Sequence, residues 1–211
     1  IIPSGTGNDF VKSVSKYMSM RKIVISSIKK KSTPIDVLKI NDDKYCINIL
    51  NVGFDALVAQ NVNIFRKLPL LSGKMKYNLS IFYSLLFNKN YKFKLRADNT
   101  VLKKSFTLIA VANGKYYGGG IIPCPDAIVD DGYANICAID STTVKQKLFF
   151  LPSYSKGKHI ENKKANFINA KSIHIVSKHE FPISIDGEII FDKKIRIKTL
   201  EKKVKIVNIL S

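Results

Sequence analysis

Residues 91–113, YKFKLRADNTVLKKSFTLIAVAN, decide the fold class because they contain two strand patterns separated by a turn. In YKFKLRA (91–97), apolar and polar side chains alternate strictly, which is typical of a β-strand with one buried face. DNT (98–100) is a turn sequence, and FTLIAVAN (106–113) is an apolar run of strand length. The stretch therefore predicts β structure rather than helix.

Similar patterns continue on both sides of this stretch. Upstream, IDVLKI (35–40) and KYCINILNVG (44–53) predict a hairpin whose turn is NDDK. Downstream, further short strands are predicted in YANICAI, KSIHIVS, FPISID, KIRIKTL and KVKIVNI (133–139, 171–177, 181–186, 194–200 and 203–209). Many short strands with turns between them predict a mainly β domain, a β-sandwich-like or barrel-like fold with helical insertions.

Three segments have helical patterns. Asn8 and Asp9 suit the start of a short helix at 7–19, in which apolar residues recur every four positions. Residues 55–65 and 73–88 are also predicted to be helical. These two helices either pack on the body of the domain or turn an apolar side toward lipid.

The composition limits the cellular location. The 211 residues are 45% hydrophobic and 10% aromatic, which is typical of a folded globular chain. No apolar run approaches the roughly 18 residues that a membrane-spanning helix needs, and the start of the chain has no signal-peptide pattern. The three cysteines form no close pair in the sequence. Together these features predict a cytoplasmic protein.

The net charge of +19 indicates a polyanionic partner. Only four of the 35 basic residues are Arg and the remaining 31 are Lys, although recognition of bases and phosphates usually favours the planar fork of Arg. A nucleic-acid partner is therefore disfavoured relative to an anionic membrane surface. The alternative is that a Lys-rich, Asn-rich and Ile-rich chain simply reflects an A/T-biased genome.

Two glycine-rich motifs contain more than folding requires. PSGTGNDF (3–10) places glycines around a Thr just before a helix, which leaves backbone N–H groups free for a phosphate. A plain turn followed by a helix cap would have the same pattern. The three glycines at 118–120 predict a tight bend, or a place where another backbone or a ligand comes close.

Two acidic motifs leave similar alternatives open. Asp130 and Asp131 precede Gly132, and a carboxylate there with nearby carbonyl oxygens suits Mg²⁺ or Ca²⁺, unless the motif is an ordinary Asp-Gly turn. Asp186 and Glu188 flank a glycine between two apolar strands. That motif is either a hairpin turn or a shared site in which one carboxylate acts as a general base.

Taken in order, these motifs resemble those of the bacterial diacylglycerol kinase-like lipid kinases, which are relatives of the diacylglycerol, sphingosine and ceramide kinases. The similarity spans nearly the whole chain. The residues that carry it are Pro3-Ser4-Gly5-Thr6-Gly7-Asn8-Asp9-Phe10, Ile35-Asp36-Val37, Asn51-Val52-Gly53-Phe54-Asp55, Gly118-Gly119-Gly120 with Pro123, Ala127 with Asp131-Gly132, and Asp186-Gly187-Glu188.

The resemblance implies two domains, an N-terminal α/β nucleotide-binding domain and a C-terminal β-rich domain. Residues 1–20 correspond to the end of the first and residues 21–211 to the second, the C-terminal lipid kinase domain. The family's Gly-Gly-Asp-Gly-Thr nucleotide loop does not occur in the sequence. The chain is therefore expected to be the back portion of a longer kinase, and to be inactive alone.

For the nucleotide side, the resemblance implies that Thr6 contacts ATP, with Gly5 and Asn8 beside it. It also implies that Asp9 joins an acidic, water-mediated Mg²⁺ network at the phosphates. ATP is the expected phosphoryl donor and Mg²⁺ the expected metal.

For the acceptor side, the resemblance implies that Glu188 is the general base, with Asp186 as the alternative. Asp131 would bind a structural Mg²⁺ through its carboxylate, assisted by the carbonyls of Ile128 and Tyr133. The base would take a proton from a lipid hydroxyl as that hydroxyl attacks the γ-phosphoryl group.

The expected protein is thus a lipid kinase of phospholipid biosynthesis, acting on diacylglycerol or a related lipid alcohol. It would be peripherally associated with an anionic membrane surface, with Phe65, Leu68, Leu70 and Leu71 as candidates for insertion. A non-catalytic membrane- or lipid-binding module and a kinase for a soluble substrate are the alternatives. Neither the substrate lipid nor a homo-oligomer is specified by the sequence.

Overall fold

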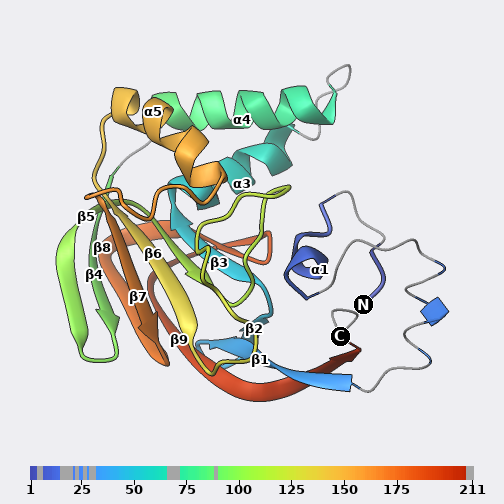
Figure 1. The fold of residues 1–211 in the computed structure, drawn as a ribbon. Helices are drawn as coiled ribbons and strands as arrows, with labels where there is room; N and C mark the ends of the chain where they lie inside the picture. Colours follow the sequence, from blue (N-terminus) through green and yellow to red (C-terminus); the bar gives the residue numbers. More distant parts are fainter. Residues whose placement is uncertain are drawn as a thin grey trace.

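The computed structural model describes residues 1–3, 7–14, 21, 24–25, 28, 32–65, 72–87 and 90–207 of the chain. Strands dominate, and of the helices whose bounds follow, α3, α4 and α5 lie together at the top of the view while α1 lies apart from them (Figure 1). The helices are α1 (Asp9–Val14), α3 (Phe54–Phe65), α4 (Gly73–Phe87) and α5 (Val144–Ser155). The strands are β1 (Ser32–Ile40), β2 (Lys44–Cys46), β3 (Ile49–Gly53), β4 (Tyr91–Ala97), β5 (Thr100–Ala112), β6 (Ala134–Asp140), β7 (Ala165–Ala170), β8 (Ser172–Ile185) and β9 (Glu188–Val207). The predicted mainly β architecture is confirmed.

The described strands form one sheet in the order β2-β1-β9-β8-β3-β5-β6-β7, and these pairings are antiparallel. β4 lies off this path and pairs with both β5 and β8. Residues 173–177 of β8 pair with β4, whereas residues 183–185 pair with β3. A register shift between Val176 and Phe181 separates these two parts of β8. The bulge lets one long strand serve two partners, so that the sheet curls around a core.

Strands β3 and β6 and residues 106–112 of β5 are buried on both faces. Ile109 and Val111 of β5 join the core enclosed by the curled sheet, whereas Leu108 and Ala110 join a second cluster that includes Phe54 and other residues of the helices. β4 alternates buried and exposed residues instead. The apolar run at 106–113 thus corresponds to a strand segment buried on both faces, and the alternation at 91–97 to a neighbouring strand buried on one face.

Helix α1 packs on the β domain. Val14 lies in a small buried cluster with Ile35 of β1 and Ile206 of β9, and Phe10 packs against that cluster. The described part of this helix is Asp9–Val14, and residues 15–19 of the predicted helix lie outside the described residues.

The predicted hairpin at 35–53 is correct in its first half and wrong in its second. β1 pairs with β2 as expected, with Leu38 opposite Cys46. After Cys46 the chain leaves β1, and β3 pairs with β5 and β8 instead. The four strands predicted between 171 and 209 are two long strands, because β8 and β9 each continue through an irregular stretch.

β7 and α5 were not predicted. β7 is the short sequence ANFINA, in which Asn residues interrupt the apolar pattern. α5 contains Pro152, which usually argues against a helix interior. Its start is fixed by a capping box, in which Gln146 N–H donates to Thr143 Oγ1 at 3.3 Å and Thr143 N–H donates to Gln146 Oε1 at 3.0 Å. None of the helices in the described parts of the chain is long and apolar enough to span a membrane.

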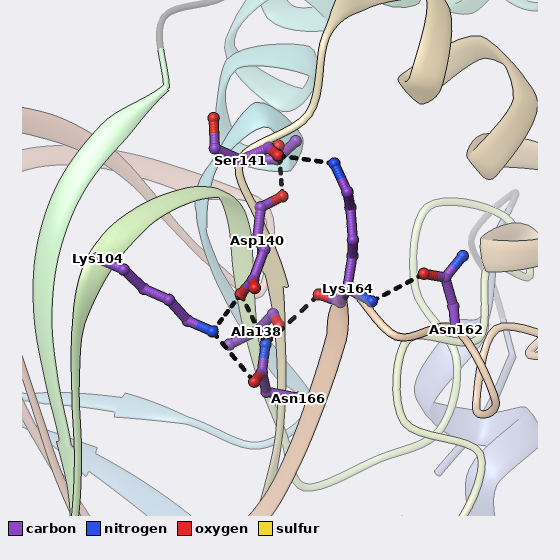
Figure 2. A network of polar contacts seen from close by, with 8 residues as sticks. Lys104, Ala138, Asp140, Ser141, Asn162, Lys164 and Asn166 are labelled. Carbon is purple, nitrogen blue, oxygen red and sulfur yellow. Dashed lines mark hydrogen bonds and ion pairs between the residues drawn. The ribbon is translucent and has the colours of Figure 1, made fainter.

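Figure 2 shows a polar network that joins β5, β6 and β7. Lys104 Nζ lies 2.6 Å from Asp140 Oδ1 and donates to Asn166 Oδ1 at 3.3 Å. Asn166 Nδ2 donates to the same Asp140 oxygen at 2.8 Å. The Lys104 and Asp140 side chains are 36% and 30% exposed, so the ion pair adds little free energy. The network instead links β5, β6 and β7 at one register.

Gly53 is the residue that lets β3 turn directly into α3, and its replacement tests this connection. Its φ is +81°, and a Cβ added there would lie 2.6 Å from the Thr107 carbonyl oxygen. Gly187 also has a positive φ, +96°, but a Cβ there would meet nothing within 4 Å. We expect Gly187→Ala to lower the free energy of unfolding by about 1–2 kcal/mol, and Gly53→Ala by at least about 3 kcal/mol. Urea titrations of both variants measure this difference, and equal losses would show that the contact with Thr107 relaxes at no cost.

Candidate functional site

The start of α1 lies against the loop that contains the three consecutive glycines. The Asn8 carbonyl accepts the first helical hydrogen bond from Lys12 N–H at 3.2 Å. Asp9 Oδ2 accepts a hydrogen bond from Gly119 N–H at 2.7 Å, and Asp9 Oδ1 lies 2.8 Å from Lys12 Nζ. The Asp9 side chain is only 13% exposed. The structure therefore brings the first two sequence motifs together through a carboxylate held by one amide and one ammonium group.

The glycine loop adopts a conformation that other residues avoid. Gly118, Gly119 and Gly120 have φ values of +58°, +90° and +118°, which L-residues rarely adopt. The loop thus shows both predicted features. The positive φ values form the bend, and α1 is the segment that comes close, through the hydrogen bond from Gly119 to Asp9. The nucleotide residues Gly5 and Thr6 lie outside the described residues, so their predicted contacts with ATP stay predictions.

Further hydrogen bonds connect α1 to the strands through residues 113–117. Ser13 Oγ accepts from Lys115 N–H at 2.9 Å. Asn48, between β2 and β3, donates from Nδ2 to the Tyr116 carbonyl at 2.9 Å, and its own carbonyl accepts from Asn113 N–H at 2.8 Å. The helix, the glycine loop and residues 47–49 therefore form one hydrogen-bonded unit.

Asp186 attaches the β8–β9 turn to this unit. Its carboxylate accepts from the backbone N–H groups of Ile47 at 2.8 Å, Asn48 at 3.1 Å and Ile49 at 3.0 Å. The thiol of Cys46 also donates to it at 3.2 Å. Burial, and secondarily the nearby Asp186 carboxylate, raise the pKa of Cys46 well above its usual value. Asp186 and Gly187 have φ values of +48° and +96°, so the motif is a tight hairpin turn whose carboxylate organises a second loop.

Glu188 differs from Asp186 in its hydrogen-bond partners, although both residues are exposed and lie in the same turn. It is the first residue of β9, and its side chain is exposed. Its carboxylate makes no hydrogen bond or ion pair with any residue that the structure describes. Of the two carboxylates, Glu188 is therefore the one with both oxygens available to a substrate.

Asp131 lies on a separate loop. The position of this loop depends on the carboxylate of Asp36, for which the sequence predicted no role. Asp131 is exposed, and its Oδ1 accepts from Tyr133 N–H at 3.0 Å. Behind it, the fully buried Asp36 accepts from Gly132 N–H at 2.6 Å and from Lys202 N–H at 2.7 Å. The signal for Asp36 was present in the sequence as an acidic residue inside the apolar strand IDVLKI.

The predicted metal ligands lie on one exposed loop. Asp131 uses one carboxylate oxygen within the loop, its other oxygen accepts no hydrogen bond from a described residue, and Ile128 and Tyr133 are 50% and 40% exposed. Carboxylate and carbonyl oxygens are the donors that Mg²⁺ prefers, so the residues fit the ion. Among the described residues, no group of three or more His, Cys, Asp or Glu side chains is arranged to hold a metal.

A pocket of about 250 Å³ lies between α1 and the loop that precedes Asp131. Its lining combines apolar side chains with a few polar ones, and consists of Ser13, Val14, Thr33, Ile35, Lys115, Ala127, Ile128, Val129 and Asp130. The pocket therefore lies between the end of α1, at Ser13 and Val14, and the acidic loop.

Asp55 was part of the resemblance but had no predicted role, and it anchors the glycine loop from behind. It lies in the first turn of α3 and is 8% exposed. Tyr117, just before the three glycines, donates its hydroxyl to Asp55 Oδ2, and Tyr154 of α5 donates to the same oxygen at 2.8 Å. Burial raises the pKa of Asp55 to about 6, against the opposing effect of the two tyrosine donors.

This carboxyl group should make stability depend on pH. Because its folded-state pKa lies above the ordinary 3.8, its contribution is complete below pH 3.8 and is lost as the pH rises through about 6. Relative to Asp55→Asn, the natural protein should therefore lose up to about 3 kcal/mol between these pH values. Urea unfolding of both proteins across this range measures the difference. A difference that does not vary with pH would contradict the raised pKa.

The chain is similar in sequence to one described family and to proteins named as kinases. Residues 48–208 match the family described as YegS C-terminal NAD kinase beta sandwich-like domain. A Staphylococcus carnosus protein named "Putative lipid kinase" is 30% identical over 210 residues, which are 99% of this chain and 68% of that protein. A diacylglycerol kinase of Mycobacterium tuberculosis is 30% identical over 181 residues, with 83% of this chain and 58% of the relative covered.

The crystal structure of a diacylglycerol kinase from Bacillus anthracis has the same fold. Its TM-score is 0.71 at 22% identity, and the match covers 99% of this chain and 65% of that one. The chain thus spans about two thirds of the length of such relatives. The resemblance expected from the sequence is confirmed: the chain belongs to the family of the YegS C-terminal NAD kinase beta sandwich-like domain, among relatives named lipid and diacylglycerol kinases.

Proposed function

We propose that this chain provides the acceptor side of a lipid kinase, which transfers the γ-phosphoryl group of ATP to the hydroxyl of diacylglycerol or a related lipid alcohol. The observation that carries the proposal is the contrast between the two carboxylates of the β8–β9 turn. Asp186 is committed to three backbone N–H groups, and Glu188, two residues away, is exposed and has no partner among the described residues.

Glu188 is the proposed general base. A base must reach the proton of the attacking hydroxyl and must itself be held in place. The anchored turn supplies the second condition, because Asp186 fixes the backbone from which Glu188 projects. As the hydroxyl oxygen attacks phosphorus, its proton passes to Glu188 and the bond to the β–γ bridging oxygen breaks.

On the donor side, Gly5 and Thr6 are proposed to contact ATP, with Asn8 and Asp9 at the start of α1. Asp9 is also proposed to take part, through water, in binding the Mg²⁺ that accompanies the nucleotide. Mg²⁺ would neutralise charge on the phosphates. A second, structural Mg²⁺ would be held by the Asp131 carboxylate and the carbonyls of Ile128 and Tyr133, stiffening the loop anchored by Asp36.

The location of the acceptor defines the proposed cellular setting. A diacylglycerol hydroxyl lies at the surface of a bilayer, so the enzyme would work as a peripheral protein on the cytoplasmic side. The charge of +19 favours attraction to anionic lipid there.

Glu188→Gln tests the base in the protein as the cell makes it. We expect phosphate transfer from ATP to diacylglycerol in mixed micelles to fall by about 10²–10⁴-fold, because the amide cannot accept the proton. The urea midpoint should not change, since the side chain is exposed and unpartnered. Glu161→Gln is the matched control, as Glu161 is also exposed. Equal activity of the two variants would remove Glu188 from the mechanism.

The 211-residue chain alone is expected to transfer no phosphate. Phosphoryl transfer depends on holding the phosphates and stabilising their charge, and the family's Gly-Gly-Asp-Gly-Thr loop is not in this sequence. The same micelle assay, run on the isolated chain and on the protein as the cell makes it, compares them directly. ATP-dependent labelling of lipid by the isolated chain would contradict the expectation.

A further inference from the structure

Helix α4 exposes large apolar side chains and buries two serines, although Leu85 is buried and Ile81 packs against the core. Ser80 and Ser84 are buried, at 0% and 1% exposure, whereas Met75 and Phe82 are 55% and 59% exposed. Ser84 Oγ accepts a hydrogen bond from Asn61 Nδ2 of α3 at 2.8 Å. A helix in contact with water normally buries its apolar stripe and exposes its polar side.

Helix α5, which contacts α4, also exposes large apolar side chains. Its Leu148 and Phe149 are 54% and 75% exposed, and α5 lies next to α4 above the sheet (Figure 1). We call this surface the helical face, and define it by its exposed apolar residues Met75, Leu79, Phe82, Val144, Leu148 and Phe149. Scattered single apolar residues are normal on a protein surface, but several on adjacent helices form a candidate interaction surface.

The helical face lies in segments without acidic residues. The sequence has no Asp or Glu between Asp55 and Asp98, and none between Asp140 and Glu161. The same segments contain twelve basic residues, namely Arg66, Lys67, Lys74, Lys76, Lys89, Lys92, Lys94, Arg96, Lys145, Lys147, Lys156 and Lys158. On the two helices themselves Lys145 is exposed and Lys76 is half-buried, whereas Lys147 is buried, so the exposed charge that these helices contribute is positive.

This combination selects one kind of partner. Exposed aromatic and aliphatic side chains gain free energy on entering an apolar medium, and the surrounding lysines are attracted to anionic head groups. Two copies of the chain would instead oppose positive charge with positive charge. We propose that the helical face docks on an anionic lipid bilayer, an inference that rests on the proposed lipid-kinase function and identifies the surface that function uses.

The proposed surface differs from the one suggested by the sequence. Phe65 is half-buried and packs edge-on against Tyr83, with ring centroids 5.8 Å apart. Leu68, Leu70 and Leu71 lie outside the described residues. Among the described side chains of α4 and α5, the aromatic ones with most exposure are Phe82 and Phe149.

Vesicle co-sedimentation of the protein as the cell makes it tests the proposal. The vesicles are pure phosphatidylcholine or phosphatidylcholine mixed with phosphatidylglycerol. Binding should require phosphatidylglycerol and weaken with salt, and Phe82→Ser or Phe149→Ser should each lower the partition coefficient by about tenfold. Tyr45→Ser is the matched control, because Tyr45 is 58% exposed on the distant strand β2. Unchanged urea midpoints confirm that each variant folds.

Several results would overturn the docking proposal. They are equal binding of all three variants, equal binding to both kinds of vesicle, or loss of self-association in Phe82→Ser with vesicle binding intact. The last would assign the helical face to contact between copies of the chain.

A short-chain diacylglycerol dissolved as monomers separates this proposal from the kinase proposal. Phe82→Ser should phosphorylate that substrate normally, whereas Glu188→Gln should not. If Phe82→Ser loses vesicle binding while Glu188→Gln remains active, docking stands and the assignment of the kinase base fails. If Glu188→Gln is inactive and Phe82→Ser binds vesicles normally, only docking fails.

Discussion

The arrangement of the candidate site depends on the Asp186 carboxylate. Three successive backbone N–H groups, at residues 47–49, donate to this carboxylate where the chain passes from β2 to β3. Without it these three groups would lose that hydrogen-bond acceptor. Hydrogen bonds to a charged acceptor are stronger than those between neutral groups. This one side chain thereby decides where the chain leaves β1, where β3 enters the sheet, and where the β8–β9 turn lies relative to the glycine loop.

Two buried carboxylates, unlike the exposed Asp186, also position loops. Asp36 of β1 holds the loop of Asp131 to β9 through Gly132 and Lys202, and Asp55, in the first turn of α3, holds Tyr117 beside the glycine loop. In each case at least one of the donors comes from a loop. The loops around the site are therefore held by Asp36, Asp55 and Asp186. Glu188 and one oxygen of Asp131 are exposed and make no hydrogen bond to a described residue.

The sequence predicted the parts of the fold that depend on local pattern. The alternation at 91–97 and the apolar runs in β3, β5 and β6 identified strands correctly because side-chain burial repeats along each strand. β7 and α5 were missed because their apolar residues are interrupted by Asn and Pro. The course of the chain after Cys46 was not predictable, since it depends on a carboxylate 140 residues away. The Asp-Gly-Glu motif is visible in the sequence. Which of its carboxylates is hydrogen-bonded could not be predicted, because the donors to Asp186 lie at residues 47–49, far away in the sequence.

The exposed apolar residues of α4 also have a consequence for the cohesion of the fold. Leu85 and Ile81 attach this helix to the core and Ser84 bonds to Asn61 of α3, whereas Met75 and Phe82 leave apolar surface in contact with water. An apolar medium on its outer side would supply the burial that the protein interior does not. In that setting the bilayer would act as an additional packing layer, and the domain would complete its hydrophobic core only where its substrate is found.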